Sequence, residues 1–199
     1  MSNNLNLINK LEKGRAEFAY NCVSGLKKLN VEESKYHYFY EGLENFKKEV
    51  IESFKKQINE EKIRKILNEI EYHAANKDNL SEKEREVIAK YNSLLNNFRS
   101  YVRKIPQMII SNGLGQTLAF VFAKKKNGNA YDLIYRQITD YLKSDATARI
   151  RMPNNQNELI KWVISLNSYE YRHVTEEILA FLNWLRRFAE GMIETEEEE

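Results

Sequence analysis

The sequence predicts an all-α fold, a compact helical bundle, and three observations support this prediction. Only seven glycines and two prolines occur in 199 residues, too few for the turns that many short strands require. Apolar residues make up 42% of the chain, which is enough for one well-packed core. Apolar residues also recur at steps of three and four along several segments, the spacing of amphipathic helices.

The first third of the chain contains an opening helix and a charged region. The helix is expected from about Leu5 to Leu29, with Phe18, Cys22 and Leu26 facing inward. Residues 33–76 follow as one or two long charged helices. Their apolar residues repeat at helical spacing: Leu43, Phe46, Val50, Ile51, Phe54 and Ile58.

A capping box marks the start of the next helix, because Ser81 is followed three residues later by Glu84. An apolar stripe then continues this helix: Leu94, Phe98, Val102, Ile105 and Ile109. Pro106 removes a backbone donor late in the stripe. We therefore expect either a kink or a helix that restarts close to Pro106.

The segment Gly113–Lys126 is apolar on nearly every side and predicts a central, buried helix. Asn112 precedes it as a plausible N-cap. Gly113 and Gly115 would let a neighbouring backbone approach closely. Gln116 is the polar exception, and it must either find a buried partner or face a neighbouring subunit.

Three more helices are expected in the last third of the chain. Two span residues 130–143 and 156–166, and the exposed loop 153–157 joins them. The last helix has the longest apolar stripe: Val174, Ile178, Phe181, Leu182, Leu185, Phe188, Ala189 and Met192.

Charge is distributed in blocks, although the net charge is only +2. Residues 1–31 carry a net charge of +3, residues 32–90 of −2, residues 91–193 of +6 and residues 194–199 of −5. We expect one helical domain over residues 1–193, followed by a disordered acidic tail at residues 194–199.

The excess of positive charge is concentrated between Tyr91 and Tyr131, where 41 residues contain no Asp or Glu. Concentrated cations beside an apolar core indicate a polyanionic partner. The candidate contacts are Arg99, Arg103, Lys104, Lys124, Lys125 and Lys126, with Arg149, Arg151, Arg186 and Arg187 as a second group.

Each candidate also has a structural alternative. Lys124–Lys126 lie where the C-terminus of a helix favours cations, so capping and solubility explain them equally well. Arg187 is expected to pair with a neighbouring carboxylate and hold the bundle together. For Arg99, Arg103 and Lys104 the absence of nearby acids favours phosphate contact.

Two segments carry a resemblance to a known family. The first reads Lys-Ile-Pro-Gln-Met-Ile-Ile-Ser-Asn-Gly-Leu-Gly-Gln-Thr-Leu-Ala-Phe, from Lys104 to Phe120. The second comprises Tyr171, Thr175, Glu176, Phe181, Leu182, Trp184, Leu185, Arg187, Phe188 and Ala189. Both resemble the small helical subunit of the Cmr complex, the type III-B CRISPR effector that degrades RNA, and Ala16–Val23 is similar to that family's first helix. The resemblance covers roughly residues 14–30 and 91–193, so residues 32–90 look like a charged helical insertion whose role is open.

This resemblance implies a non-catalytic subunit that acts in antiviral defence. In the family, copies of the small subunit stack beside the backbone subunits, which hold the CRISPR RNA and cut the target RNA. The implied partners are other Cmr complex subunits, further copies of the chain, and the paired CRISPR RNA and target RNA. An A-form duplex presents mainly phosphates and 2′-hydroxyls, so Lys and Arg residues suffice to bind it without reading bases.

Little in the sequence supports catalysis, a cofactor or a small-molecule substrate. His37, His73 and His173 are scattered, and no phosphate-binding loop, nucleophile elbow or zinc spacing is present. Glu176 and Glu177 diverge by about 100° on a helix and cannot chelate a metal together without other ligands.

The remaining residue types indicate a soluble protein of the reducing cytoplasm with no membrane partner. A single cysteine excludes an internal disulfide, and no apolar run has the length of a signal peptide or a membrane span. Trp162 and Trp184 are expected in the core or a subunit interface and not stacked on bases.

A second function agrees with the same residues. The chain would then be a purely protein-binding helical scaffold whose basic face docks on acidic partners and never contacts RNA. The mixed charge of residues 32–90 suits helix–helix contact, and the acidic tail could meet a basic patch on the next copy.

Overall fold

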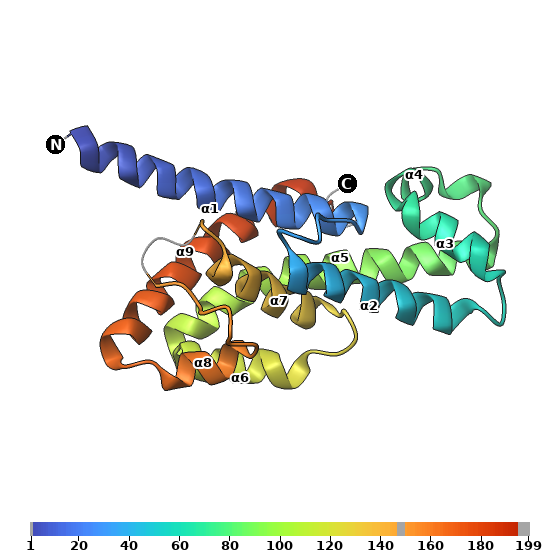
Figure 1. Ribbon diagram of the computed structural model, residues 1–199. Coiled ribbons are helices and arrows are strands. Elements are labelled where there is room, and N and C mark those ends of the chain that lie inside the picture. Colours follow the sequence, from blue (N-terminus) through green and yellow to red (C-terminus); the bar gives the residue numbers. More distant parts are fainter. Residues whose placement is uncertain (1, 147–149, 195–199) are drawn as a thin grey trace.

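The computed structural model describes residues 2–146 and 150–194, with side chains from Lys10 onward, and every regular element in these ranges is helical (Figure 1). The all-α prediction is therefore confirmed. The elements are α1 (Ser2–Lys28), α2 (His37–Phe54), α3 (Glu60–Asn68), α4 (Ile70–Ala75), the short 3₁₀ helix η1 (Lys77–Asn79), α5 (Glu82–Asn112), α6 (Leu114–Lys124), α7 (Ala130–Lys143), α8 (Leu159–Ser165) and α9 (Ser168–Met192).

The long helices α1, α5 and α9 form the frame of the bundle. Helix α9 packs against both α1 and α5, while α7 packs against α2, α5 and α6. The start of α1 extends beyond the bundle, and α3 and α4 lie together near the start of α5 (Figure 1). The predicted inward residues Phe18, Cys22 and Leu26 are buried, as is the whole predicted stripe of α5 from Leu94 to Ile109.

Residues 33–76 form three short helices, so the prediction of one or two long ones is wrong. Helix α2 ends at Phe54, and the side chain of Asn59 then accepts a hydrogen bond from the Glu61 N–H and starts a new helix. This region packs on the chain's own core, because α2 lies against α7. Lys62 on α3 also pairs with Glu84 on α5 at 2.7 Å.

Helix α5 confirms the capping box of Ser81 and Glu84. The helix restart that Pro106 would allow is absent, because α5 runs through Pro106 to Asn112. Pro106 is buried together with Ile105 and Ile109, and this packing offsets the hydrogen bond that the proline cannot donate. The chain turns instead at Gly113, whose φ of 84° favours glycine.

Helix α6 lies at the surface, so the prediction of a central, buried helix is wrong. One face is covered by α5 and α7, and only Leu114, Thr117, Leu118 and Val121 are buried. Phe120 and Phe122 remain 38% exposed, and Gln116 is exposed. Part of the apolar surface of α6 is therefore not covered by the rest of the bundle.

The N-cap residue of α6 differs from the predicted Asn112. Asn112 ends α5, and Gly113 takes the N-cap position of α6. The group that approaches Gly115 is a side chain and not a backbone: the Gly115 N–H donates to the hydroxyl of Tyr171 on α9 at 2.8 Å. This bond attaches the start of α6 to α9.

A buried ion pair joins α1 to α9. The guanidinium of Arg15 donates to both carboxylate oxygens of Glu177, at 2.9 and 2.7 Å, and the hydroxyl of Tyr141 on α7 donates to the same carboxylate. Arg15 also pairs with Glu12 at 2.6 Å, and the indole of Trp184 donates to Glu12 at 2.9 Å. The Glu177 side chain is only 6% exposed, so its partners and not water stabilise the charge.

Removal of this buried charge should destabilise the bundle. We expect Glu177→Gln to lower the free energy of unfolding by about 3 kcal/mol, because Arg15 then loses its buried carboxylate partner and keeps only the more exposed Glu12. Urea denaturation followed by far-UV circular dichroism measures the change. The matched control is Glu176→Gln, one residue away and 52% exposed, which should cost less than about 1 kcal/mol. Equal losses in the two variants would contradict this role for Glu177.

Candidate nucleic-acid interface

The three cations predicted on α5 occupy different environments. Arg103 and Lys104 are exposed, whereas Arg99 is half-buried and has contacts within the chain. The expectation that acids are absent here is wrong for Arg103, because α9 crosses α5 and places Glu190 at 3.2 Å from its Nε atom. Both partners are well exposed, so this pair is weak and leaves Arg103 available to a phosphate.

The cations predicted on α9 adjoin this contact. Arg186 is half-buried one turn before Glu190, and Arg187 is exposed. Among the described residues, no carboxylate lies within ion-pair distance of Arg187, which lies instead over the ring of Trp184 at 5.6 Å. The predicted carboxylate partner of Arg187 is therefore wrong. Trp184 is half-buried and hydrogen-bonded to Glu12, and Trp162 is 5% exposed, in agreement with structural roles for both.

The lysines at the end of α6 also divide by environment. Lys125 pairs with Glu158 at 3.8 Å and lies over the rings of Phe122 and Tyr135, at 4.3 and 4.5 Å. These contacts fix the end of α6 against the segment before α8. Lys124 and Lys126 are exposed on either side of it.

An aromatic cluster connects α5, α6 and α7 beside these lysines. Tyr101 stacks on Tyr131 with ring centres 4.0 Å apart, and Phe120 meets Tyr131 edge-on at 5.7 Å. Helical spacing places Lys104 one turn after Tyr101, and Lys124 one turn after Phe120. The cluster therefore packs α5 and α6 against α7 close to Lys104 and Lys124 in sequence.

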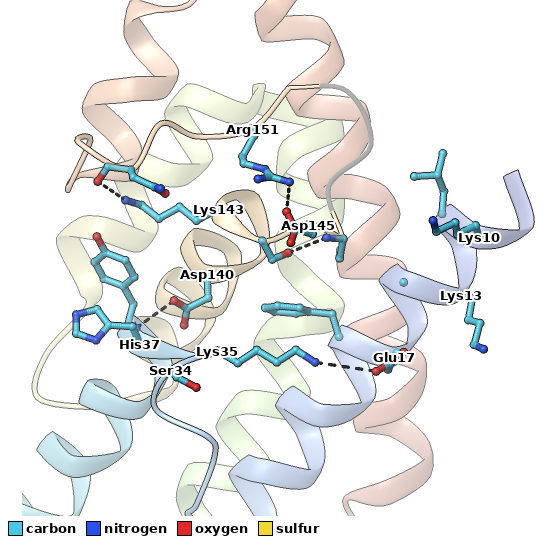
Figure 2. A pocket seen from close by; sticks show the side chains of 17 residues that line it. Lys10, Lys13, Glu17, Ser34, Lys35, His37, Asp140, Lys143, Asp145 and Arg151 are labelled. Carbon is cyan, nitrogen blue, oxygen red and sulfur yellow. Dashed lines mark hydrogen bonds and ion pairs between the residues drawn. The ribbon is translucent and has the colours of Figure 1, made fainter. Parts of the chain in front are cut away.

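Arg151 lies elsewhere, in a cleft of about 1230 Å³ between α1, the start of α2 and the end of α7 (Figure 2). Arg149 falls outside the described residues. Phe18 lines the cleft together with five basic side chains, and Figure 2 shows them on both sides of the opening. The five are Lys10, Lys13, Lys35, Lys143 and Arg151.

Sequence reasoning missed four of these five basic residues. Lys10 and Lys13 lie three positions apart on one face of α1, and this spacing was a usable signal. Lys35 and Lys143 join them only because the α1–α2 connection folds against the end of α7. No local pattern in the sequence reports such a contact.

Asp140 on α7 is a buried acid that lines the cleft. Its carboxylate accepts hydrogen bonds from the N–H groups of Tyr38 and Phe39, at 3.1 and 2.7 Å, and so caps α2 from another helix. Burial raises the pKa of Asp140 to about 6, although the two N–H groups oppose this shift.

No group of His, Cys, Asp or Glu that could hold a metal ion occurs in the described part of the chain. His173 lies 3.5 Å from Glu176 and edge-on to Tyr169, which is a helix-surface contact. Within the same part of the chain, no helix has the length and apolar content needed to cross a membrane.

One family model matches the chain, and its description reads CRISPR-associated protein (Cas_Cmr5). The match spans residues 74–192, more than half of the chain, and contains all of α5 to α9. Both blocks that carry the resemblance to the Cmr small subunit lie within it. Helices α1, α2 and α3 lie outside the match, so the status of residues 32–90 as an insertion stays a prediction.

The buried Asp140 should make stability depend on pH. Its pKa is raised from an ordinary value of 3.8 to about 6, so its ionisation costs more in the folded state. The protonated carboxyl adds roughly 2 to 3 kcal/mol to the free energy of unfolding below about pH 4. This contribution is lost as the pH rises through about 6. Urea unfolding at pH 4.5 and pH 7 should show this loss in the wild-type chain and not in Asp140→Asn. Asp145→Asn, at a 95% exposed side chain, is the control and should behave as wild type.

Proposed function

The chain belongs to the Cas_Cmr5 family of CRISPR-associated proteins, and from this premise we propose that it is a non-catalytic small subunit of a type III-B effector complex. Family membership implies association with other Cmr complex subunits. In this proposal the basic surface over α5 and α6 contacts the backbone of target RNA that is paired with the CRISPR RNA.

The observation that carries the proposal is the exposure of four cations within the acid-free segment. Arg103 and Lys104 on α5 and Lys124 and Lys126 around the end of α6 are all exposed, and all lie inside the family match. Phosphate contact needs exposed positive charge and no shaped pocket, because a duplex in the A form offers its backbone to proteins. These four residues are therefore the strongest candidates among the ten that were predicted.

The alternative of a protein-binding scaffold is favoured by a different observation. Large apolar side chains are exposed on α5, α6, α8 and α9. They are Ile110 at 73%, Phe120 and Phe122 at 38%, Ile164 at 68% and Tyr169 at 73%. Exposed apolar side chains that gather into one patch mark protein contacts. We assign the exposed apolar side chains to contacts with neighbouring subunits and the exposed cations of α5 and α6 to contacts with RNA.

Loss of the exposed α5 cations should weaken RNA binding by the assembled complex. The variant Arg103→Gln with Lys104→Gln removes two phosphate contacts, so we expect a roughly tenfold loss of affinity. The slope of log affinity against log salt concentration should also become less steep by about one to two. Filter binding of guide-paired RNA across a salt titration measures both quantities. Co-purification with the other subunits verifies that the variant still assembles.

The matched control is Lys48→Gln with Lys56→Gln, which removes the same charge at two exposed lysines of the α2 region, outside the family match. Its RNA affinity and salt dependence should equal those of the wild-type complex. An unchanged salt dependence in the Arg103 and Lys104 variant would rule out the basic surface of α5 as an RNA contact.

Crosslinking separates the two candidate functions directly. RNA crosslinks between residues 99 and 126 in the assembled complex support the RNA-contact role. Crosslinks to protein alone in that range support the scaffold.

A further inference from the structure

We propose that the basic cleft between α1, α2 and α7 binds the acidic segment 194–199 of another copy of this chain. This inference rests on the proposed function in one respect, because it requires copies to lie next to one another.

The cleft has positive charge that its own acids do not neutralise. In the described part of the chain, no carboxylate lies within ion-pair distance of Lys10, Lys13 or Lys143. Lys143 donates instead to the carbonyl oxygens of Pro153 and Asn154, at 3.4 and 3.2 Å, and these are neutral groups. Three lysines therefore line the cleft without a compensating carboxylate.

The acids that line the cleft already have partners. Glu17 lies 4.0 Å from Lys35, and Asp145 pairs with Arg151, as the dashed lines in Figure 2 show. The third acid, Asp140, accepts the two N–H groups at the start of α2. The cleft as a whole thus presents an excess of positive charge to a ligand.

The shape of the cleft suits an extended peptide better than a nucleic-acid duplex. Its volume of about 1230 Å³ lies between α1, the start of α2, the end of α7 and the loops beside them, and its lining mixes basic groups with Leu11, Gly14, Phe18 and Ala146. A duplex contacts proteins along a broad surface, whereas an extended segment of six residues spans about 20 Å and can lie within such a hollow. A peptide rich in carboxylates is therefore the occupant that fits both charge and shape.

The chain itself contains such a peptide. Residues 194–199 read Glu-Thr-Glu-Glu-Glu-Glu and carry a net charge of −5, the most concentrated charge in the sequence. They directly follow α9, which ends at Met192. Five glutamates opposite a cleft with three uncompensated lysines are electrostatically complementary.

Binding of this segment to the cleft of its own chain is unfavourable. Glu12 and Arg15 face α9, and helical spacing places Lys10, Lys13 and Glu17 on the opposite side of α1. The end of α9 lies beside the second half of α1, where Phe188 contacts Tyr20 (Figure 1). The end of α9 therefore lies on one side of α1, and the cleft opens on the other. The segment of a neighbouring copy can reach the cleft without passing around α1.

Such a contact joins two different surfaces, one from each copy. A head-to-tail contact of this kind forms an open row when the rotation between copies does not close, and a ring when it does. An open row is the arrangement that stacking of small subunits along an elongated complex requires.

The experiment uses a fluorescein-labelled peptide of residues 190–199 and a chain that ends at Glu194, which cannot compete with its own segment. Fluorescence anisotropy should show saturable binding that weakens with salt. The cleft variant Lys10→Ser with Lys13→Ser should bind the peptide roughly tenfold more weakly. Lys48→Ser with Lys56→Ser, which loses the same charge outside the cleft, should bind as the parent chain does.

Sedimentation velocity tests the contact between whole chains. The full chain should form concentration-dependent oligomers, whereas the chain ending at Glu194 and the full-length cleft variant should each remain smaller. A mixture of these two defective chains should form heterodimers, because one supplies the cleft and the other the acidic segment.

Three results would overturn the proposal. They are equal binding of a peptide whose glutamates are replaced by glutamine, equal binding by the cleft variant, and cleft-dependent binding of single-stranded polyuridine in place of the peptide. None of these results bears on the α5 surface, whose RNA contacts are measured with separate variants in the assembled complex.

Discussion

The bundle depends on one buried carboxylate, that of Glu177. Arg15 from α1 and Tyr141 from α7 both donate to it, so three helices that are distant in sequence meet at one charged group. The rings of Tyr141 and Phe181 stack directly beside it at 4.3 Å. A buried charge tolerates few arrangements of its partners, because each unmatched hydrogen bond is costly where water is absent. The angle at which α1 crosses α9 is therefore set by hydrogen-bond geometry as well as by apolar packing.

Apolar periodicity predicted the helices but not their neighbours. The stripe from Leu94 to Ile109 and the inward residues of α1 are buried as expected, because helical spacing is a local property. The exposure of α6 was not predictable, because composition reports how apolar a helix is and not how much of it one chain covers. The same limit applies to Arg103, whose partner Glu190 lies 87 residues away in sequence and meets it only where α9 crosses α5.

The acid-free segment combines two kinds of surface. Its central part, from Ile105 to Leu118, supplies core packing and the turn between α5 and α6, while Arg103, Lys104, Lys124 and Lys126 on either side are exposed. Charge counting along the sequence located the segment, but it did not separate Lys125, which two aromatic rings and Glu158 hold in place, from its exposed neighbours Lys124 and Lys126. The cleft near Lys10 lay outside this count, because its cations come from four separate segments.

The turn at Gly113 has a consequence for how the chain can change in evolution. Helices α5 and α6 are joined by this single residue, and Tyr171 holds the first turn of α6. One inserted residue would rotate α6 by about 100° and move the bulky aromatic side chains of its surface to a different side. The connection between α2 and α3, residues 55–59, has no such constraint, since it is a loop whose residues are mostly exposed. Length variation among relatives should therefore accumulate at the α2–α3 connection and be absent at Gly113, which makes the turn a fixed point for aligning distant members of the family.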